Sequence, residues 1–277
     1  MTNYFPDTNE EILAEHAKLV SDKEYIKRKS NYKKKSKDLD GTDNTRVDEQ
    51  RFDESFNLFK TLVETKSKTV FISFSENIYT RQEEGYKYDV YEKARKALSF
   101  GDWKKEDVGT GKIFDFVISA IKINADNVKN NIIHWISIDK FIENKKSENI
   151  NKYEESFFEF YNNLKSDEDS LFDFIEFFGK NYPLIGYLFF IKDLTKYMPI
   201  NPNNFDKAFE KLGVQDFKTS GRCSWKNYSR FNGLLNEVKE LLSKKGIKDT
   251  SLLDAHSFVW MIRDIEKKLD KAGILKK

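Results

Sequence analysis

The sequence predicts a mainly α fold with a minor β element, that is, a multi-helix α+β protein with one short hairpin or strand pair. Its 277 residues include 39% hydrophobic and 34% charged residues but only four prolines, a composition that suits a helical protein. Apolar residues recur at helical spacing along most of the chain, whereas residues 68–75 and 182–200 lack that spacing. Because there are 24 Phe and 13 Tyr, we expect cores built from aromatic rings.

The chain is long enough for one large domain or two smaller ones. We expect a charged, partly flexible N-terminal arm over residues 1–50, an N-terminal helical region over residues 51–150 and a C-terminal α+β domain over residues 151–277. The arm is indicated by its charge and by the polar connector KSKDLDGTDNTRVDEQ that ends it, which offers little apolar surface to bury.

The first half of the chain contains one predicted strand among helices. The stretch Lys68–Ser75 alternates and is rich in β-branched and aromatic residues, which favours a strand. Phe56, Phe59 and Leu62 share one face of a helix expected over Asp53–Thr65. The other helices expected here are Asn9 to about Lys29, Tyr88–Ser99, Ile113–Ile123 and Asn130–Asn144.

The second half is also mainly helical. The exception is YPLIGYLFFIKDLTKYMPI, residues 182–200, which we expect to form two extended segments joined at Lys192–Thr195. A short buried helix before Lys192 is the alternative. The helices expected in this half are Glu154–Leu164, Ser170–Phe178, Pro202–Leu212, Ser224–Lys244 and Ser251 to about Lys271.

The net charge of +2 is unevenly distributed. Basic residues predominate in residues 18–37 and 207–248, and acidic residues predominate in residues 154–176. Such blocks attract a polyanion or one another. No stretch approaches the roughly 18 apolar residues of a membrane span, and the N-terminus MTNYFPDTNEEI lacks the order of a signal peptide. We therefore expect a cytoplasmic protein without a membrane partner.

The stretch GTGK, residues 109–112, has part of the pattern of a phosphate-binding loop. The full pattern needs a glycine where Glu106 stands and a serine or threonine where Ile113 stands. We therefore favour a tight turn before a helix. No metal site and no cofactor are predicted, because the only histidines, His16, His134 and His256, are far apart in sequence.

The single cysteine, Cys223, excludes an internal disulfide framework. It follows Arg222 and precedes a predicted helix start, two features that favour a thiolate, and His256 is the candidate base. However, His256 lies in LLDAHSFVWMI, a stretch that is apolar on almost every side. We therefore favour a buried histidine, stacked on Trp260 and hydrogen-bonded through a ring nitrogen, over a catalytic pair.

Two basic stretches are candidates for nucleic-acid binding, since lysine and arginine contact phosphate. The first is KRKSNYKKKSK, residues 27–37. The second is the start of the helix expected from Ser224, where Tyr228 and Phe231 face inward and the basic side chains face outward. A solvated charged surface is the alternative for both. The candidate binding residues are Lys27, Arg28, Lys29, Lys33, Lys34, Lys35, Arg222, Lys226 and Arg230.

Several quoted stretches resemble a region found in bacterial proteins associated with restriction-type and His-Asn-His endonucleases. They are NNIIHWISIDKF (130–141), FFIKDLTKYMPINPNNFDKAFEKLGV (189–214), CSWKNYSRFN (223–232) and LLDAHSFVWMI (252–262). The resemblance implies an association with DNA restriction or with defence against foreign DNA. It carries over no nuclease centre, because the zinc-knuckle cysteines and metal-binding histidines of a His-Asn-His enzyme have no counterparts in this sequence.

The leading hypothesis is a non-catalytic, DNA-associated recognition or accessory protein of a restriction or phage-defence system. Its partners would be DNA and a protein encoded in the same defence operon. One alternative is a DNA endonuclease with an unrecognised active site, which would require Mg²⁺ or another divalent metal. The other alternative is a helical protein–protein interaction module whose acidic segment, residues 154–176, meets a basic partner.

Overall fold

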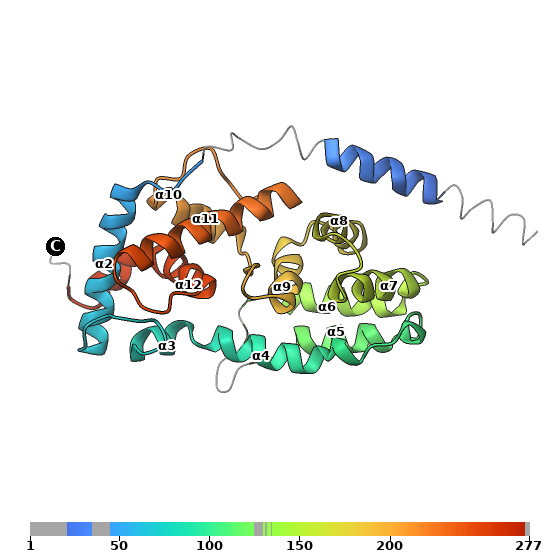
Figure 1. The fold of residues 1–277 in the computed structure, drawn as a ribbon, viewed down its shortest axis with the longest axis horizontal. Coiled ribbons are helices and arrows are strands. Elements are labelled where there is room, and N and C mark those ends of the chain that lie inside the picture. The colour runs from blue at the N-terminus through green and yellow to red at the C-terminus, as the bar shows by residue number, and fades with distance from the viewer. Residues whose placement is uncertain (1–20, 35–44, 125–129, 131, 134, 275–277) are drawn as a thin grey trace, which may run out of the picture. The chain divides into compact units, whose positions relative to one another are not determined.

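The computed structural model describes residues 21–34, 45–124, 130, 132, 133 and 135–274 (Figure 1). The chain separates into two units, residues 1–40 and residues 41–277, and residues 21–34 of the first unit are helical. The described residues form helices, turns and irregular segments, with no strand among them. The mainly α prediction is confirmed, and the predicted β element is wrong. Residues 9–20 of the first expected helix, and Lys35, lie outside the described residues.

The first helices of the second unit are α2 (Glu49–Ser67), α3 (Ile78–Glu84), α4 (Tyr86–Leu98) and α5 (Lys112–Ile121). Helices α2, α4 and α5 agree with the predicted ones to within a few residues, whereas α3 was not predicted. Two short 3₁₀ turns, Phe100–Asp102 and Lys105–Asp107, connect α4 to α5. The Asp48 side chain accepts a hydrogen bond from the Arg51 N–H and so caps the start of α2.

The predicted strand at residues 68–75 is instead the irregular connection between α2 and α3. Lys68 ends α2 with a left-handed backbone, φ 58°, and the Glu64 carboxylate accepts a hydrogen bond from the Phe71 N–H at 2.9 Å. Phe71 and Phe74 are buried against Phe59. The alternation therefore reflects two rings that turn inward from a loop, and the described part of the chain contains no strand with which this segment could pair.

The first of the two extended segments expected over residues 182–200 is also wrong, and the alternative of a buried helix before Lys192 is confirmed; residues 197–200, in the second segment, are not helical. The buried helix is α9 (Tyr182–Lys192), which begins after Asn181 and has Pro183 in its first turn. Every residue from Leu184 to Ile191 is buried. A helix that is apolar on all sides has no polar face, so periodicity alone does not separate it from a strand.

The remaining helices complete the second unit. They are α6 (Trp135–Glu143), the 3₁₀ turn Asn144–Lys146, α7 (Ile150–Tyr161), α8 (Asp167–Phe178), α10 (Pro202–Lys211), α11 (Trp225–Lys244), α12 (Leu252–Ile262) and α13 (Ile265–Lys271). The single helix expected from Ser251 to Lys271 is thus divided at residues 263–264. Residue 150, near which we expected a domain boundary, begins α7, and α7 packs against α5.

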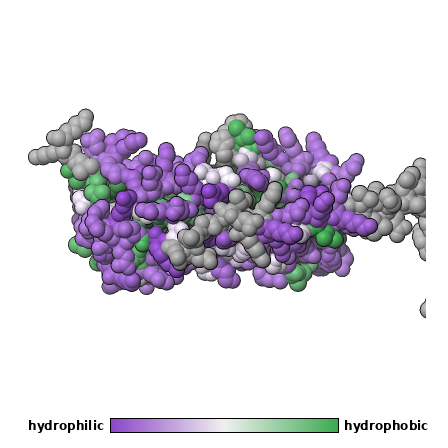
Figure 2. Space-filling model, turned by 90° about the horizontal axis from the view of Figure 1, so that it is seen from above, coloured by the Kyte–Doolittle hydropathy of each residue, from purple (hydrophilic) through white to green (hydrophobic). Residues whose placement is uncertain are grey.

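Aromatic rings fill the interior, as expected. Phe52, Phe56 and Phe59 of α2 contact Phe258 of α12. A second cluster joins α5, α6, α7 and α8 through Phe114, Phe141, Phe157, Phe174 and Phe178. Helix α11 packs against both α8 and α12. On the face shown in Figure 2, hydrophilic residues predominate and hydrophobic residues occur in small separate areas.

Candidate functional site

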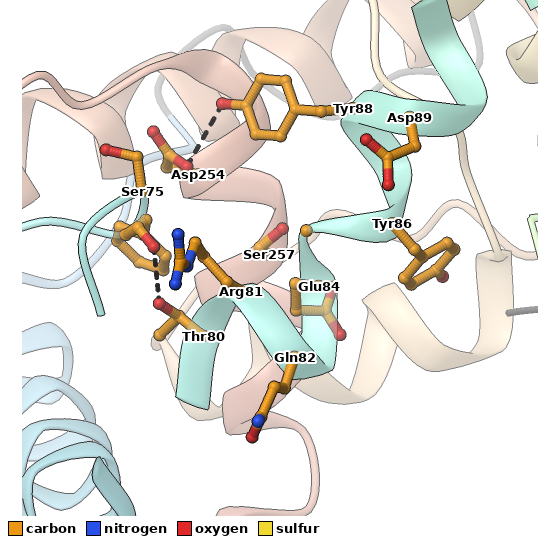
Figure 3. Close-up of a pocket in the computed structure, with 12 residues that line it drawn as sticks. Ser75, Thr80, Arg81, Gln82, Glu84, Tyr86, Tyr88, Asp89, Asp254 and Ser257 are labelled. Carbon is orange, nitrogen blue, oxygen red and sulfur yellow. Dashed lines mark hydrogen bonds between the residues drawn. The ribbon is translucent and has the colours of Figure 1, made fainter. Parts of the chain in front are cut away.

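A cleft of about 530 Å³ lies where the junction of α3 and α4 meets α12 (Figure 3). Phe74 and Ser75, from the loop before α3, line one part of it, and Tyr86 and Tyr88 of α4 line another. Asp254 and Ser257 lie on the same cleft wall because they are three residues apart on α12. The cleft therefore combines aromatic rings with hydroxyl and charged groups, as ligand-binding sites commonly do.

Hydrogen bonds hold two walls of this cleft together. Ser251 caps α12, and its N–H and hydroxyl donate to Asp254 Oδ2 at 2.9 and 2.8 Å. The Tyr88 hydroxyl lies 2.7 Å from Ser251 Oγ and donates to Asp254 Oδ1 at 3.3 Å. Burial raises the pKa of Asp254, and hydrogen bonds from Ser251 and Tyr88 oppose that rise. Burial, followed by the negative charge of Asp254, raises the pKa of Tyr88 to about 12.

A chain of buried polar groups lies behind the cleft. Lys87, which is 2% exposed, forms an ion pair with Glu84 and lies 3.1 Å from His256 Nδ1. His256 Nε2 lies 2.9 Å from the Pro199 carbonyl oxygen. Because a carbonyl only accepts, Nε2 carries the proton and Nδ1 accepts from the Lys87 ammonium. Burial and the charge of Lys87 lower the pKa of His256 well below its usual value, so the imidazole is neutral.

These buried polar groups, Glu84, Lys87 and His256, position the helices around the cleft. They connect the start of α4 to α12 and to the segment before α10. Burial lowers the pKa of Lys87, and the adjacent Glu84 carboxylate opposes that change. The favoured interpretation of His256 as a buried, hydrogen-bonded histidine is confirmed. Its ring contacts Phe205, with centroids 4.9 Å apart, where we had expected Trp260.

Cys223 lies in a different environment from His256. The thiol is buried, and burial raises its pKa to about 12, against the opposing effect of the nearby Lys180 ammonium. Both imidazole nitrogens of His256 are already bonded to Lys87 and Pro199. A thiolate nucleophile with His256 as its base therefore does not fit this geometry.

The GTGK stretch is a tight turn before α5, as favoured from the sequence. Gly109 and Gly111 have left-handed φ angles of 86° and 84°. The fully buried Glu154 carboxylate of α7 accepts hydrogen bonds from the N–H groups of Gly109 and Gly111, at 2.7 and 3.0 Å, and of Phe114, at 2.8 Å. These N–H groups point to one place, as in an anion-binding loop. The chain's own carboxylate fills that place.

The predicted basic residues near residue 30 lie on the helix of the first unit. Lys27, Arg28 and Lys34 are exposed, whereas Lys29 and Lys33 are half-buried. Arg28 pairs with Glu24 at 3.8 Å, four residues earlier, which is a weak exposed pair. Lys35 lies outside the described residues.

The three predicted basic residues of the second unit have different surroundings. Arg222 is exposed and Lys226 is half-buried at the first turn of α11. Ser224 caps this helix, and Tyr228 and Phe231 are buried on its inner face as predicted. Arg230, in contrast, donates through both terminal nitrogens to Glu237 at 3.2 Å.

Two further lysines approach the start of α11, and sequence reasoning missed them. The Tyr182 hydroxyl donates to Asn227 Oδ1 at 3.0 Å, and the Asn227 amide donates to the Lys218 carbonyl at 2.9 Å. These bonds bring the exposed residues Lys180 and Lys218 close to the first turn of α11. We call Lys180, Lys218, Arg222 and Lys226 the α11 patch. The feature that could have indicated this patch is Asn227, because a buried asparagine needs hydrogen-bond partners for its amide.

Among the described residues, no group of three or more His, Cys, Asp or Glu side chains is placed to hold a metal ion. His16 and His134 are outside them. No helix within the described ranges is both long enough and apolar enough to span a bilayer.

Comparison with known proteins gave no match. No protein-family model matches the chain, and no curated protein or solved structure is significantly similar to it.

Proposed function

We propose that the chain is a non-catalytic DNA-binding component of a restriction or phage-defence system. The observation that carries the proposal is the α11 patch, where four basic residues from three segments surround the first turn of a 20-residue helix. Phosphate contacts from lysine, arginine and helix N–H groups fix a protein on DNA without reading its sequence. Lys180 and Lys218 form no ion pair within the described residues, which leaves their charges for phosphate.

The first unit adds basic residues to the second. Lys27, Arg28 and Lys34 are exposed on its helix, and the acidic residues within its described part, residues 21–34, are Asp22 and Glu24. Exposed charges attract DNA over roughly one Debye length, about 8–10 Å at physiological salt. The restriction or phage-defence context rests on the resemblance of residues 130–141, 189–214, 223–232 and 252–262, and a protein partner from a defence operon belongs to the same proposal.

The acidic segment supports this proposal over the protein-interaction alternative, because several of its carboxylates are used inside the fold. Glu154 binds the turn before α5. Asp173 pairs with Lys165 at 2.7 Å and accepts from Ser156 at 3.1 Å. Asp167 pairs with Lys192 at 2.7 Å. A basic partner would therefore meet fewer unpaired carboxylates than the sequence of residues 154–176 suggests.

The test is filter binding of the full chain to duplex DNA over a salt series. We expect affinity to fall with salt, and the double variant Lys180→Glu/Lys218→Glu to flatten the slope of log K against log salt by about 2, because each lost phosphate contact contributes about 1. The control variant Lys239→Glu/Lys267→Glu changes the charge equally. Lys239 is thirteen residues beyond Lys226 on α11, about 20 Å along the helix, and Lys267 is an exposed residue of α13.

The control should retain nearly the wild-type slope. Equal slopes for the two double variants, or no binding at low salt, would refute the α11 patch as a DNA contact. DNA recovered from the same incubations with Mg²⁺ or Mn²⁺ distinguishes the nuclease alternative, because a non-catalytic component leaves the duplex intact.

A further inference from the structure

The cleft between α3, α4 and α12 is lined by Ser257, whose hydroxyl makes no hydrogen bond within the described residues. Ser257 is 4% exposed and in Figure 3 points from α12 toward the α3–α4 junction. Its Oγ has no hydrogen bond within the described part of the chain. Other helical serines here bond to the carbonyl four residues earlier, as Ser119 does at 2.8 Å and Ser243 at 3.1 Å. The Ser257 oxygen is open to the cleft rather than sealed inside the protein, so a group bound in the cleft can form a hydrogen bond with it.

Two charged side chains of opposite sign also line the cleft without partners. Arg81 of α3 and Asp89 of α4 form no ion pair within the described residues. They lie on opposite sides of the cleft in the view of Figure 3. A guanidinium binds a carboxylate through two parallel hydrogen bonds, and a carboxylate pairs with an ammonium. The cleft thus offers a separate place for each charge of one ligand.

The rest of the lining decides which anionic ligands fit. Glu84, Asp89 and Asp254 place three carboxylates around the cleft. Glu84 is paired with Lys87, which lies behind the cleft, and the basic residue in the lining itself is Arg81. A phosphate with two charges would be repelled there, whereas a single carboxylate is matched by one arginine. The rings of Phe74, Tyr86 and Tyr88 provide apolar contact, and about 530 Å³ is within the usual range for a small-molecule site.

We propose that this cleft binds a small zwitterion of the amino-acid type. Arg81 and the Ser257 hydroxyl donate hydrogen bonds to its carboxylate, Asp89 pairs with its ammonium, and the aromatic rings contact its side chain. This site is separate from the α11 patch, so it does not depend on DNA binding.

The test is equilibrium dialysis and calorimetry of the full chain with each free L-amino acid in turn. We expect at least one to bind with 1:1 stoichiometry. The decarboxylated amine and the deaminated acid of the same side chain should each bind at least about tenfold more weakly, because each loses one charge-assisted interaction. If no amino acid binds at about 10 mM, a concentration at which even millimolar affinities are detected, the proposal is overturned. Equal binding of the amine or the acid overturns it as well.

Two substitutions locate the binding site. Ser257→Ala removes one hydroxyl and should weaken binding about 5–10-fold. Arg81→Gln changes an exposed side chain and should weaken it by about tenfold or more. Ser243→Ala is the matched control, because that hydroxyl bonds to its own helix, and it should bind as wild type does. Wild-type affinity in both Ser257→Ala and Arg81→Gln would place the ligand elsewhere and refute the assignment.

Discussion

Replacing Glu154 tests how the connection between α4 and α5 is held. Its carboxylate accepts three hydrogen bonds, at 2.7, 3.0 and 2.8 Å, from Gly109, Gly111 and Phe114. A hydrogen bond to a charged group is worth about 1.5–3 kcal/mol. Gly109 is exposed and Gly111 half-buried, so water replaces part of two bonds in Glu154→Ala. The Phe114 N–H, on a residue that is 0% exposed, loses its bond outright.

These contributions predict that Glu154→Ala lowers the free energy of unfolding by about 3 kcal/mol. In a unit of this size that lowers the melting temperature by about 6–12 °C. Glu154→Gln keeps the shape and one oxygen acceptor but turns an N–H₂ toward a donor, so we expect a loss of about 1–2 kcal/mol. The control is Glu155→Ala, whose carboxylate is 48% exposed in its pair with Lys105, and it should change stability by less than about 0.5 kcal/mol.

Urea unfolding followed by far-ultraviolet circular dichroism measures these differences. Inorganic phosphate gives a second reading, because the three N–H groups freed in Glu154→Ala form an empty anion site. Phosphate should therefore stabilise Glu154→Ala more than it stabilises the wild type or Glu155→Ala. If Glu154→Ala unfolds at the same urea concentration as Glu155→Ala, the loop does not depend on this carboxylate and the reasoning fails.

Two further predictions concern glycine packing and pH. Gly186→Ala should destabilise by about 0.5–2 kcal/mol, because a Cβ there would lie 2.9 Å from Ile200 Cγ2 and overpacking exceeds the gain in helix propensity. Gly233→Ala is the control, because its Cβ would have its nearest neighbour at an ordinary van der Waals distance of 3.5 Å, and it should stabilise the protein by about 0.5–1 kcal/mol. Equal shifts in melting temperature for the two variants would contradict the close packing at Gly186. His256 is neutral in the fold because its pKa is lowered, so only the unfolded chain takes up its proton as the pH falls below about 6.5. Between about pH 7.5 and 5.5 the wild type should lose up to about 1.4 kcal/mol more stability than His256→Gln, and parallel urea profiles of the two proteins would refute a neutral buried imidazole.

Most helices were predictable because one face of each is apolar. The inner face of α11, with Tyr228 and Phe231, was predicted and is buried. The two errors have physical causes. Residues 68–75 alternate because Phe71 and Phe74 turn inward from a loop, and α9 has no polar face because it is surrounded by protein. The spacing of apolar residues shows which positions are buried. It identifies the backbone conformation only where one face of the segment is buried and the other is exposed.

The cleft was less predictable than the helices. Arg81 and Asp89 are ordinary exposed residues in the sequence, and Ser257 lies in an apolar helix more than 160 residues later in the chain. Only the meeting of α3 and α4 with α12 brings them around one space. His256 was correctly expected to be buried, but its partner Lys87 comes from a different helix, and long-range pairs of this kind carry no local signal.

The charge pattern also needed the fold, because the protein supplies many of its own counterions. Glu237 holds Arg230 and also pairs with Arg46 at 3.1 Å, and it accepts a hydrogen bond from the Val47 N–H at 3.1 Å. Arg230 therefore helps to fix the segment before α2 against α11, and its charge is largely offset before any phosphate approaches. The basic residues that matter for a polyanion are those left after such pairs are subtracted. In the second unit, the expected phosphate contact therefore shifts from Arg230, which is paired, to Lys180 and Lys218, which are not paired within the described residues. These two lysines are far apart in sequence, so a count of neighbouring basic residues would not have grouped them.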